Sequence, residues 1–340
     1  MHVLYAKISS TQHELEIEID ASDLDKYIDK AASSLSLNLD IQGFRKGHAP
    51  RNMVLRYAGA DKLYNEAGEI AVRASYAAAL NSEEGRKLKE VSYELEVPEI
   101  RITKLAPDNS FIYKAIFTIP VFELAKDYSE IAARVRKSEA KGVSVEDKEI
   151  EDTLEWLKKS RKADAINDDF AKSIGNFQNI EQLKKSISEG ILMEKEKKEK
   201  ERVRLAIIKE IILKSKKEIP DKIIALEISR IEEEFKENIS DMGLDFDEYL
   251  VKIKKDKKEL RVGWQDQARE RVEISSALGA IARRENINPT EQEIKSEAEN
   301  ILRRYKKVKD AEKEYDPEAL KGYVTRILRN KKVFEFLESK

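Results

Sequence analysis

One long helical pattern dominates the second half of the chain. Apolar residues recur at helical spacing from Leu183 to Ile191 and again from Val203 to Ile212, with no proline and one glycine over the whole stretch. The pattern predicts a single helix of about 35 residues, roughly 50 Å long at about 1.5 Å per residue. Its middle, "MEKEKKEKERVR", is polar all round and is typical of a solvated helix face. We therefore expect this half to be built from long helices.

Further helices are expected up to the C-terminus. Ile224 begins a packing stripe with spacings of four and three that runs to Met242 and stops at Gly243. Helix starts are indicated by a capping side chain with a carboxylate in the following turn. They lie at Ser144 with Asp147, Asp245 with Glu248, Asp256 with Glu259, Thr290 with Glu293, and Asp316 before Pro317. From residue 144 to 340 we expect an all-α body of antiparallel helices.

The first half has a different texture. "HELEIEI", residues 13–19, alternates strictly and predicts a half-buried strand. Two amphipathic helices are expected after it, the first capped by Ser22 with Asp25 and the second with a stripe of small residues from Leu63 to Ala78. "VSYELEVPEIRI" and "SFIYKAIFTIPVFEL" then return to period two. We expect an α+β domain over residues 1–120, with helices on an antiparallel sheet, and a linker over 121–143.

Composition excludes several kinds of chemistry. The 340 residues contain 64 Lys and Arg against 66 Asp and Glu, no cysteine and three histidines. Thiolate sites are therefore absent, and the sequence has no phosphate-binding glycine loop, no HExxH and no GxSxG motif. We expect no catalytic residues, no metal and no cofactor, and we expect Trp156 and Trp264 to pack in cores. Without a signal-like start or an apolar run of membrane-spanning length, the chain is expected to be soluble and not exported.

One loop departs from the balanced charge. From Ile41 to Ala60 there is no acidic residue, while four Lys and Arg give a local charge of about +4. Gly43 and Gly47 bracket Phe44, so the backbone can turn sharply on both sides of a projecting tip. An aromatic side chain beside arginine can anchor a protein interface, but the same residues also suit an inert surface turn. The residue chemistry leaves both interpretations open.

A family resemblance favours the interface. "GFRKGHAP" resembles the G-F-R-x-G-x-x-P signature of the bacterial trigger factors, chaperones that dock at the ribosomal exit tunnel. Segments such as "INDDFAKSIGNFQNIEQLKKSI" and "ALGAIARRENINPTEQEI" resemble the helical body of that family, so the similarity extends over nearly the whole chain. The resemblance implies docking to an exit-tunnel ribosomal protein and nearby ribosomal RNA. The residues at the docking positions are Gly43, Phe44, Arg45, Lys46, Gly47 and Pro50.

The chain departs from the family pattern in one respect. Typical members carry an inserted FKBP-type peptidyl-prolyl isomerase domain of roughly a hundred residues. Between Val143 and Met242 this sequence has only Gly175 and Gly190 as glycines, and no run that alternates as a strand. We therefore expect a trigger factor without its isomerase, and no enzyme activity.

The expected function is a cytoplasmic chaperone that shields unfolded nascent chains without crossing or binding a membrane. Two alternatives stay open: a prolyl isomerase like the full-length family, and a helical scaffold or adaptor. A homodimer is a further candidate assembly. Residues left over from packing are the candidate client contacts: Ile223, Met242, Leu244, Phe246 and Tyr249.

Overall fold

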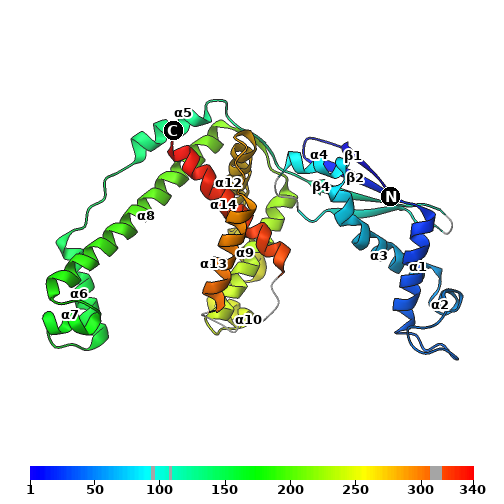
Figure 1. Cartoon of the computed structure of the whole chain (residues 1–340), viewed down its shortest axis with the longest axis horizontal. Coiled ribbons are helices and arrows are strands. Elements are labelled where there is room, and N and C mark those ends of the chain that lie inside the picture. Colours follow the sequence, from blue (N-terminus) through cyan, green and yellow to red (C-terminus); the bar gives the residue numbers. More distant parts are fainter. Residues whose placement is uncertain (93–95, 107–108, 307–315) are drawn as a thin grey trace. The chain divides into compact units, whose positions relative to one another are not determined.

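The computed structural model describes residues 1–92, 96–106, 109–306 and 316–340. They divide into two compact units, one formed by residues 1–122 with 217–279 and the other by 123–216 with 280–340. Figure 1 labels the helices and strands along the chain.

A four-stranded antiparallel sheet forms the base of the first unit. Its order is β1-β2-β4-β3, with β1 at His2–Lys7, β2 at Gln12–Ile19, β3 at Glu99–Lys104 and β4 at Phe111–Thr118. Two further strands, β5 (Val121–Glu123) and β6 (Lys216–Glu218), form a separate two-stranded sheet. In β2 and β4 the buried residues alternate, and the register places Leu15 opposite Ala115 and Ile17 opposite Tyr113. One face of these central strands is therefore continuous core.

Four helices accompany this sheet: α1 (Ala21–Ser36), α2 (Arg51–Ala58), α3 (Ala60–Asn81) and α4 (Glu83–Val91). The buried side of α3 presents mostly small residues, including Ala67, Ala71 and Ser75, which allow α1 to pack closely against it. The Ser75 hydroxyl lies 2.8 Å from the buried Tyr113 hydroxyl, so the polar tip of that aromatic side chain has a partner in the core.

The rest of the first unit is helical. It comprises α9 (Asp221–Asp241), α10 (Phe246–Ile253), α11 (Lys257–Gly263) and most of α12 (Gln265–Arg284). Ile224, Ile228 and Ile231 of α9 form a small core with Ala268 of α12 and the half-buried Trp264. We call α9 to α12 the second arm, because the helices of residues 147–214 come before it in the chain.

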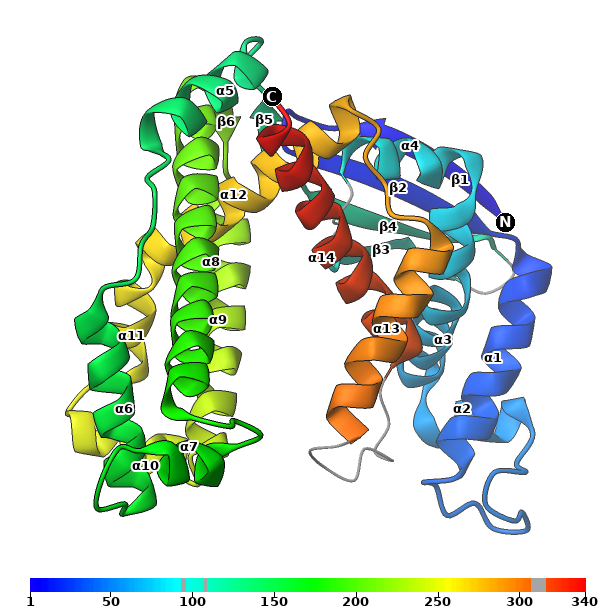
Figure 2. The ribbon, with the colours of Figure 1, turned by 60° about the vertical axis from the view of Figure 1, so that its left-hand side comes forward.

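The second unit contains α5 (Tyr128–Glu139), α6 (Asp147–Arg161), α7 (Asp168–Ile174), α8 (Ile180–Lys214), α13 (Glu291–Lys306) and α14 (Pro317–Glu338). Figure 2 shows α6 and α7 at one end of α8, where Leu154, Phe170 and Leu183 form a separate core. Helices α5 and α14 pack together near the other end of α8. Arg204 of α8 pairs there with Glu338, with one nitrogen–oxygen distance of 3.0 Å.

The fold class is confirmed: an α+β region is followed by a helical body, and α8 is 35 residues long. The helix starts after Asp245, Asp256 and Asp316 are also as predicted, and Thr290 with Glu293 exchange the expected capping hydrogen bonds. The division of the chain at residues 120 and 144 stays a prediction. The expected linker, residues 121–143, contains β5 and α5.

Several local predictions were wrong. Helix α1 begins after Asp20 rather than at a Ser22 cap, and α6 is capped by Glu146 with Glu149. The buried row of α3 passes through Ala71, Ser75 and Ala79 and leaves Ala74 and Ala78 exposed. Trp156 is 66% exposed rather than packed in a core. The strand β6 lies in a region where none was expected, and residues 93–95 of the predicted strand lie outside the described residues.

His13 makes the stability of the first unit depend on pH. The side chain is buried in β2, and its Nδ1 lies 2.7 Å from the Tyr5 hydroxyl. Burial, and then the nearby Lys7, lower the pKa of His13 below its ordinary value. Since the unfolded chain takes up the proton first, stability is full above about pH 6.5 and is lost as pH falls below it.

We predict that His13→Gln reduces this pH dependence. Between pH 6.5 and 5.5 its free energy of unfolding, measured in urea, should fall less steeply than that of wild type, by up to about 1.4 kcal/mol per pH unit. Gln12→Asn, at the exposed start of the same strand, provides the control, because it removes no ionisable group and should keep the wild-type slope. Parallel curves for wild type and His13→Gln would contradict this assignment.

Candidate functional site

The loop between α1 and α2 is held by the core at both ends. Ile41 and Ala49 are buried members of the main core cluster, and residues 42–48 between them lie outside it. Two anchored ends fix the position of the loop relative to the sheet and helices. The side chains at its tip are therefore presented from a rigid base.

Two consecutive turns shape the loop. The Phe44 N–H donates to the Ile41 carbonyl at 3.2 Å, and the His48 N–H donates to the Arg45 carbonyl at 3.0 Å. Gly43 and Gly47 occupy the third position of these turns, with φ of +88° and +83°. Such values favour glycine, because an L side chain is strained there. A Cβ on Gly47 would also lie 2.8 Å from Leu37 Cδ2.

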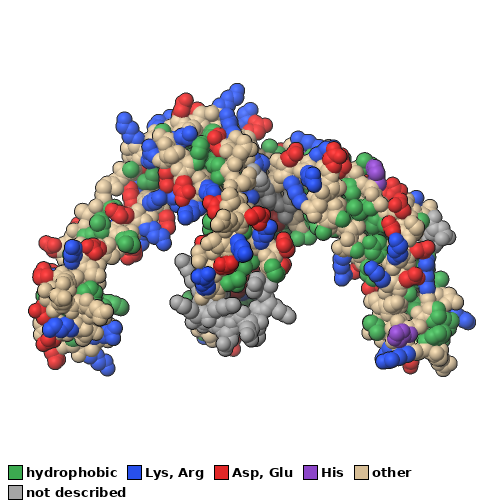
Figure 3. Space-filling view, viewed as in Figure 1, with side chains coloured by type: hydrophobic (Ala, Val, Ile, Leu, Met, Phe, Trp, Pro, Cys, Tyr) green, Lys and Arg blue, Asp and Glu red, His purple; other side chains and the backbone are tan. Residues whose placement is uncertain are grey.

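The turns expose both apolar and basic side chains. Phe44 is 42% exposed, and Arg45, Lys46 and Pro50 are exposed beside it. Figure 3 shows hydrophobic, basic and histidine side chains gathered at the end of the unit that carries the α1–α2 loop. The six predicted residues are therefore together on one loop.

Helix α2 and the end of α1 add residues that the sequence patterns did not single out. Leu37, Leu55 and Tyr57 are exposed apolar side chains next to the loop in sequence. On α2, Val54 is buried and Ala58, four residues later, is half-buried, so this side of the helix faces the core. Leu55 and Tyr57 are left on the outward side. With the helix placed at residues 51–58, the sequence spacing alone would have predicted that these two side chains are exposed.

The charges of this tip are mostly unpaired. Arg51 is paired with Asp25 at 2.8 Å, whereas Arg45, Lys46 and Arg56 make no ion pair with any residue that the structure describes. Unpaired guanidinium and ammonium groups beside an exposed aromatic ring suit a partner that offers carboxylates or phosphates around an apolar pocket. This arrangement can bind a macromolecular surface.

The candidate client contacts differ in exposure: one is buried, two are half-buried and two are exposed. Ile223 is buried and offers no surface. Met242 is 72% exposed and Leu244 is also exposed, so the stripe of α9 ends before Met242. Phe246 and Tyr249 are half-buried because their rings pack edge-on against Phe235, at centroid distances of 6.2 and 5.8 Å.

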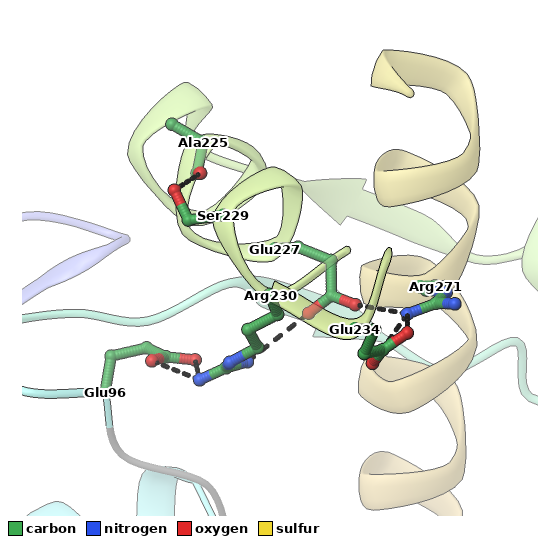
Figure 4. Close-up of polar contacts among 7 residues, drawn as sticks. All are labelled: Glu96, Ala225, Glu227, Ser229, Arg230, Glu234 and Arg271. Carbon is green, nitrogen blue, oxygen red and sulfur yellow. Dashed lines mark hydrogen bonds and ion pairs between the residues drawn. The ribbon is translucent and has the colours of Figure 1, made fainter. Parts of the chain in front are cut away.

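A chain of ion pairs along α9 holds the second arm. Nη2 of Arg230 donates to both carboxylate oxygens of Glu96, at 2.6 and 2.8 Å, and Nη1 lies 3.3 Å from Glu227 (Figure 4). Arg271 of α12 pairs with the same Glu227 at 3.4 Å and with Glu234 at 2.9 Å. Because these groups are partly solvated, salt should weaken this network more than the apolar core beneath it.

Neither a metal centre nor a membrane span is found in the part of the chain that the structure describes. No group of three His, Asp or Glu side chains there is placed to hold a metal ion. None of the described helices combines the length and apolar character that crossing a bilayer requires.

Two family models match the chain. "Bacterial trigger factor protein (TF)" matches residues 1–157, and "Bacterial trigger factor protein (TF) C-terminus" matches residues 179–339. Residues 158–178 between them form the end of α6, the helix α7 and their connections. No domain of about a hundred residues is inserted there.

Curated relatives support the same family. A trigger factor of Caldicellulosiruptor bescii is 25% identical over 401 residues, covering 90% of each chain. A trigger factor of Clostridium botulinum is 23% identical over 430 residues, covering 99% of this chain and 98% of the relative. Since this chain has 340 residues, at least 90 of those 430 aligned positions have no counterpart in it.

A solved structure shares the fold. It is described as "Promiscuous Substrate Recognition in Folding and Assembly Activities of the Trigger Factor Chaperone" and covers 100% of both chains, with a TM-score of 0.51 and 14% identity. The two family models together match nearly the whole chain, from residue 1 to 339. The chain therefore belongs to the bacterial trigger factor family, ribosome-associated chaperones whose N-terminal domain is the ribosome-binding part.

Proposed function

We propose that the loop from Gly43 to Pro50 docks this chain at the nascent-chain exit of the ribosome. The observation that carries the proposal is the glycine-shaped tip that presents Phe44 beside the unpaired Arg45 and Lys46. Phe44 is the apolar anchor for a pocket on an exit-tunnel ribosomal protein. Arg45 and Lys46 pair with carboxylates of that protein and with phosphates of adjacent ribosomal RNA.

Docking brings the helical body to emerging polypeptides. Exposed apolar side chains such as Met242 and Leu244 then cover hydrophobic segments of the nascent chain and delay wrong burial until more sequence has emerged. Each contact must be weak so that the client can leave, and several weak contacts together supply the holding affinity. In this proposal residues 1–120 dock, residues 121–143 link, and residues 144–340 hold clients.

We also propose that the chain works without isomerase activity, in the cytoplasm where ribosomes translate. The two family models match residues 1–157 and 179–339, which leaves no interval of about a hundred residues for the isomerase domain. A homodimer off the ribosome remains a separate hypothesis, and sedimentation of the free protein over a concentration series would test it.

The docking proposal predicts that Phe44→Ala with Arg45→Ala weakens ribosome binding by about 30-fold or more, as expected for loss of interface anchors of at least about 2 kcal/mol. Co-sedimentation with purified ribosomes measures this loss. Both side chains are exposed, so the thermal unfolding midpoint should be unchanged.

A matched control is available on α6. Trp156→Ala with Arg161→Ala removes an exposed aromatic and one exposed positive charge away from the loop. This variant should co-sediment like wild type. If the loop variant also does so, the loop is not the docking site.

The absence of isomerase activity is tested by direct measurement. In a protease-free assay on a proline-containing peptide, cis/trans exchange should keep its uncatalysed time of tens to hundreds of seconds at any concentration of this protein. An FKBP-type enzyme serves as the positive control. Acceleration proportional to the amount of purified chain would overturn the proposal.

A further inference from the structure

The turn between α10 and α11 concentrates positive charge at the end of the second arm. We call residues 251–262 the basic turn. It contains five lysines and one arginine against two carboxylates, a net charge of +4 in a chain whose total is −2. The arm therefore ends in a local field opposite in sign to the chain as a whole.

Internal pairing leaves most of these cations free. Arg261 is paired with Glu232 at 2.6 Å, and Lys257 lies 3.6 Å from Asp247. The other four make no ion pair with any residue in the described ranges and are exposed to solvent: Lys252, Lys254, Lys255 and Lys258.

Both carboxylates of the turn are engaged by the backbone. Asp256 accepts from the Glu259 N–H at 2.8 Å, and Glu259 accepts from the Asp256 N–H at 3.0 Å. This capping box fixes the start of α11, because the two carboxylates accept hydrogen bonds from backbone N–H groups at the helix N-terminus. Neither acid forms an ion pair with a lysine of the turn among the described contacts.

Exposed apolar side chains lie among these lysines. Val251 is 77% exposed and Val262 is 66% exposed. On α11, Lys258 and Val262 are four residues apart and so share one side of the helix. Met242 and Leu244 are exposed on the segment that leads into α10. Exposed aliphatic side chains interspersed along the turn with unpaired lysines suit an occupant that carries both apolar and acidic residues.

We propose that the basic turn selects client segments in which apolar residues are flanked by aspartate or glutamate. This proposal rests on the chaperone function proposed above and adds the chemical class of client that this arm prefers. Charge complementarity supplies the selectivity, while the aliphatic side chains give a contact that most unfolded segments can share.

The same charges could attract nucleic acid, but the side chains present favour polypeptide. Single-stranded RNA is held by aromatic platforms and arginine stacking. The exposed apolar residues of the basic turn are aliphatic, its free cations are all lysine, and Arg261 is engaged by Glu232. Isolated lysines beside valines bind carboxylates without offering a base-stacking surface.

The test uses the full chain and three fluorescent peptides that share one apolar core of leucine and valine. The flanks of the peptides are four glutamates, four glutamines or four lysines. Wild type should bind the glutamate-flanked peptide about tenfold more tightly than the lysine-flanked one in anisotropy titrations at low salt. The preference should shrink as ionic strength rises.

Two sets of substitutions locate the effect. Changing Lys252, Lys254, Lys255 and Lys258 to Gln should abolish the tenfold preference and leave binding of the glutamine-flanked peptide within about twofold of wild type. The control changes four other exposed, unpaired lysines to Gln, namely Lys148, Lys159, Lys185 and Lys197, for the same change in net charge. The control should keep the full preference.

A second pair of variants tests the aliphatic part. Val251→Ser with Val262→Ser should weaken binding of all three peptides by a similar factor, about threefold to tenfold. Val97 is 88% exposed and lies outside the basic turn, so Val97→Ser serves as its control.

The outcomes separate this inference from the function on which it rests. Equal affinity of wild type for all three peptides would overturn the charge preference while leaving the chaperone proposal intact. Equal loss of preference in both lysine variants would assign it to net charge and also overturn the inference. Binding of an RNA oligonucleotide is measured as well. If the basic-turn variant loses affinity for this RNA but for none of the peptides, the partner of the turn is nucleic acid and the inference is overturned. If wild type binds no peptide at all, the chaperone proposal itself fails.

Discussion

The packing of one face of β2 and β4 against α1 and α3 is the interaction on which the proposed docking site depends. Leu15, Ile17 and Tyr113 are fully buried on that face, and Ile41 and Ala49 belong to the same cluster. The loop between those two residues makes few internal contacts beyond its two turns. Its shape comes from glycine, but its position comes from the core. A cavity-forming substitution at Ile41 would therefore be expected to disturb the loop without changing any residue of its tip.

The first unit combines two kinds of cohesion. Apolar burial holds the sheet and its helices, whereas α9 is joined to α12 and to Glu96 by shared arginine and glutamate pairs above a small apolar core. Moderate salt screens partly exposed ion pairs and affects apolar packing much less. The proposed docking loop therefore rests on apolar packing, whereas the arm that carries the candidate client contacts is held partly by ion pairs.

Sequence patterns predicted the elements whose burial follows a simple period. The strand β2 and the helix α8 were both predicted, because β2 alternates along its length and α8 has apolar residues at helical spacing near both ends with no proline between them. β1 was missed because it is an edge strand with only Val3 and Tyr5 half-buried, and α4 because it is short and strongly charged. The loop could be located from its glycines and charges, but those residues alone left its role open, and only the family resemblance favoured docking.

Exposure of single side chains was harder to predict than the elements that carry them. Trp156 and Ile223 both lie on predicted helices, yet the tryptophan is exposed and the isoleucine is buried. Helical spacing says which residues share a face, but which face meets a partner depends on packing between segments distant in sequence. The basic turn shows the same limit: its lysines were visible in the sequence, but their lack of ion-pair partners emerged only with the fold.

The length of α8 constrains which insertions and deletions this helix can accept during evolution. Its polar middle separates the core at Leu183 from the residues around Ile207 that pack near its other end. Losing seven residues there would bring the two packing sites about 10 Å closer while rotating their faces by only about 20°. Losing five would turn the faces by about 140° and misalign one of them. Natural variants of α8 should therefore differ in length by nearly whole numbers of helical turns. The distance between its two packing sites can then change while their relative orientation is preserved.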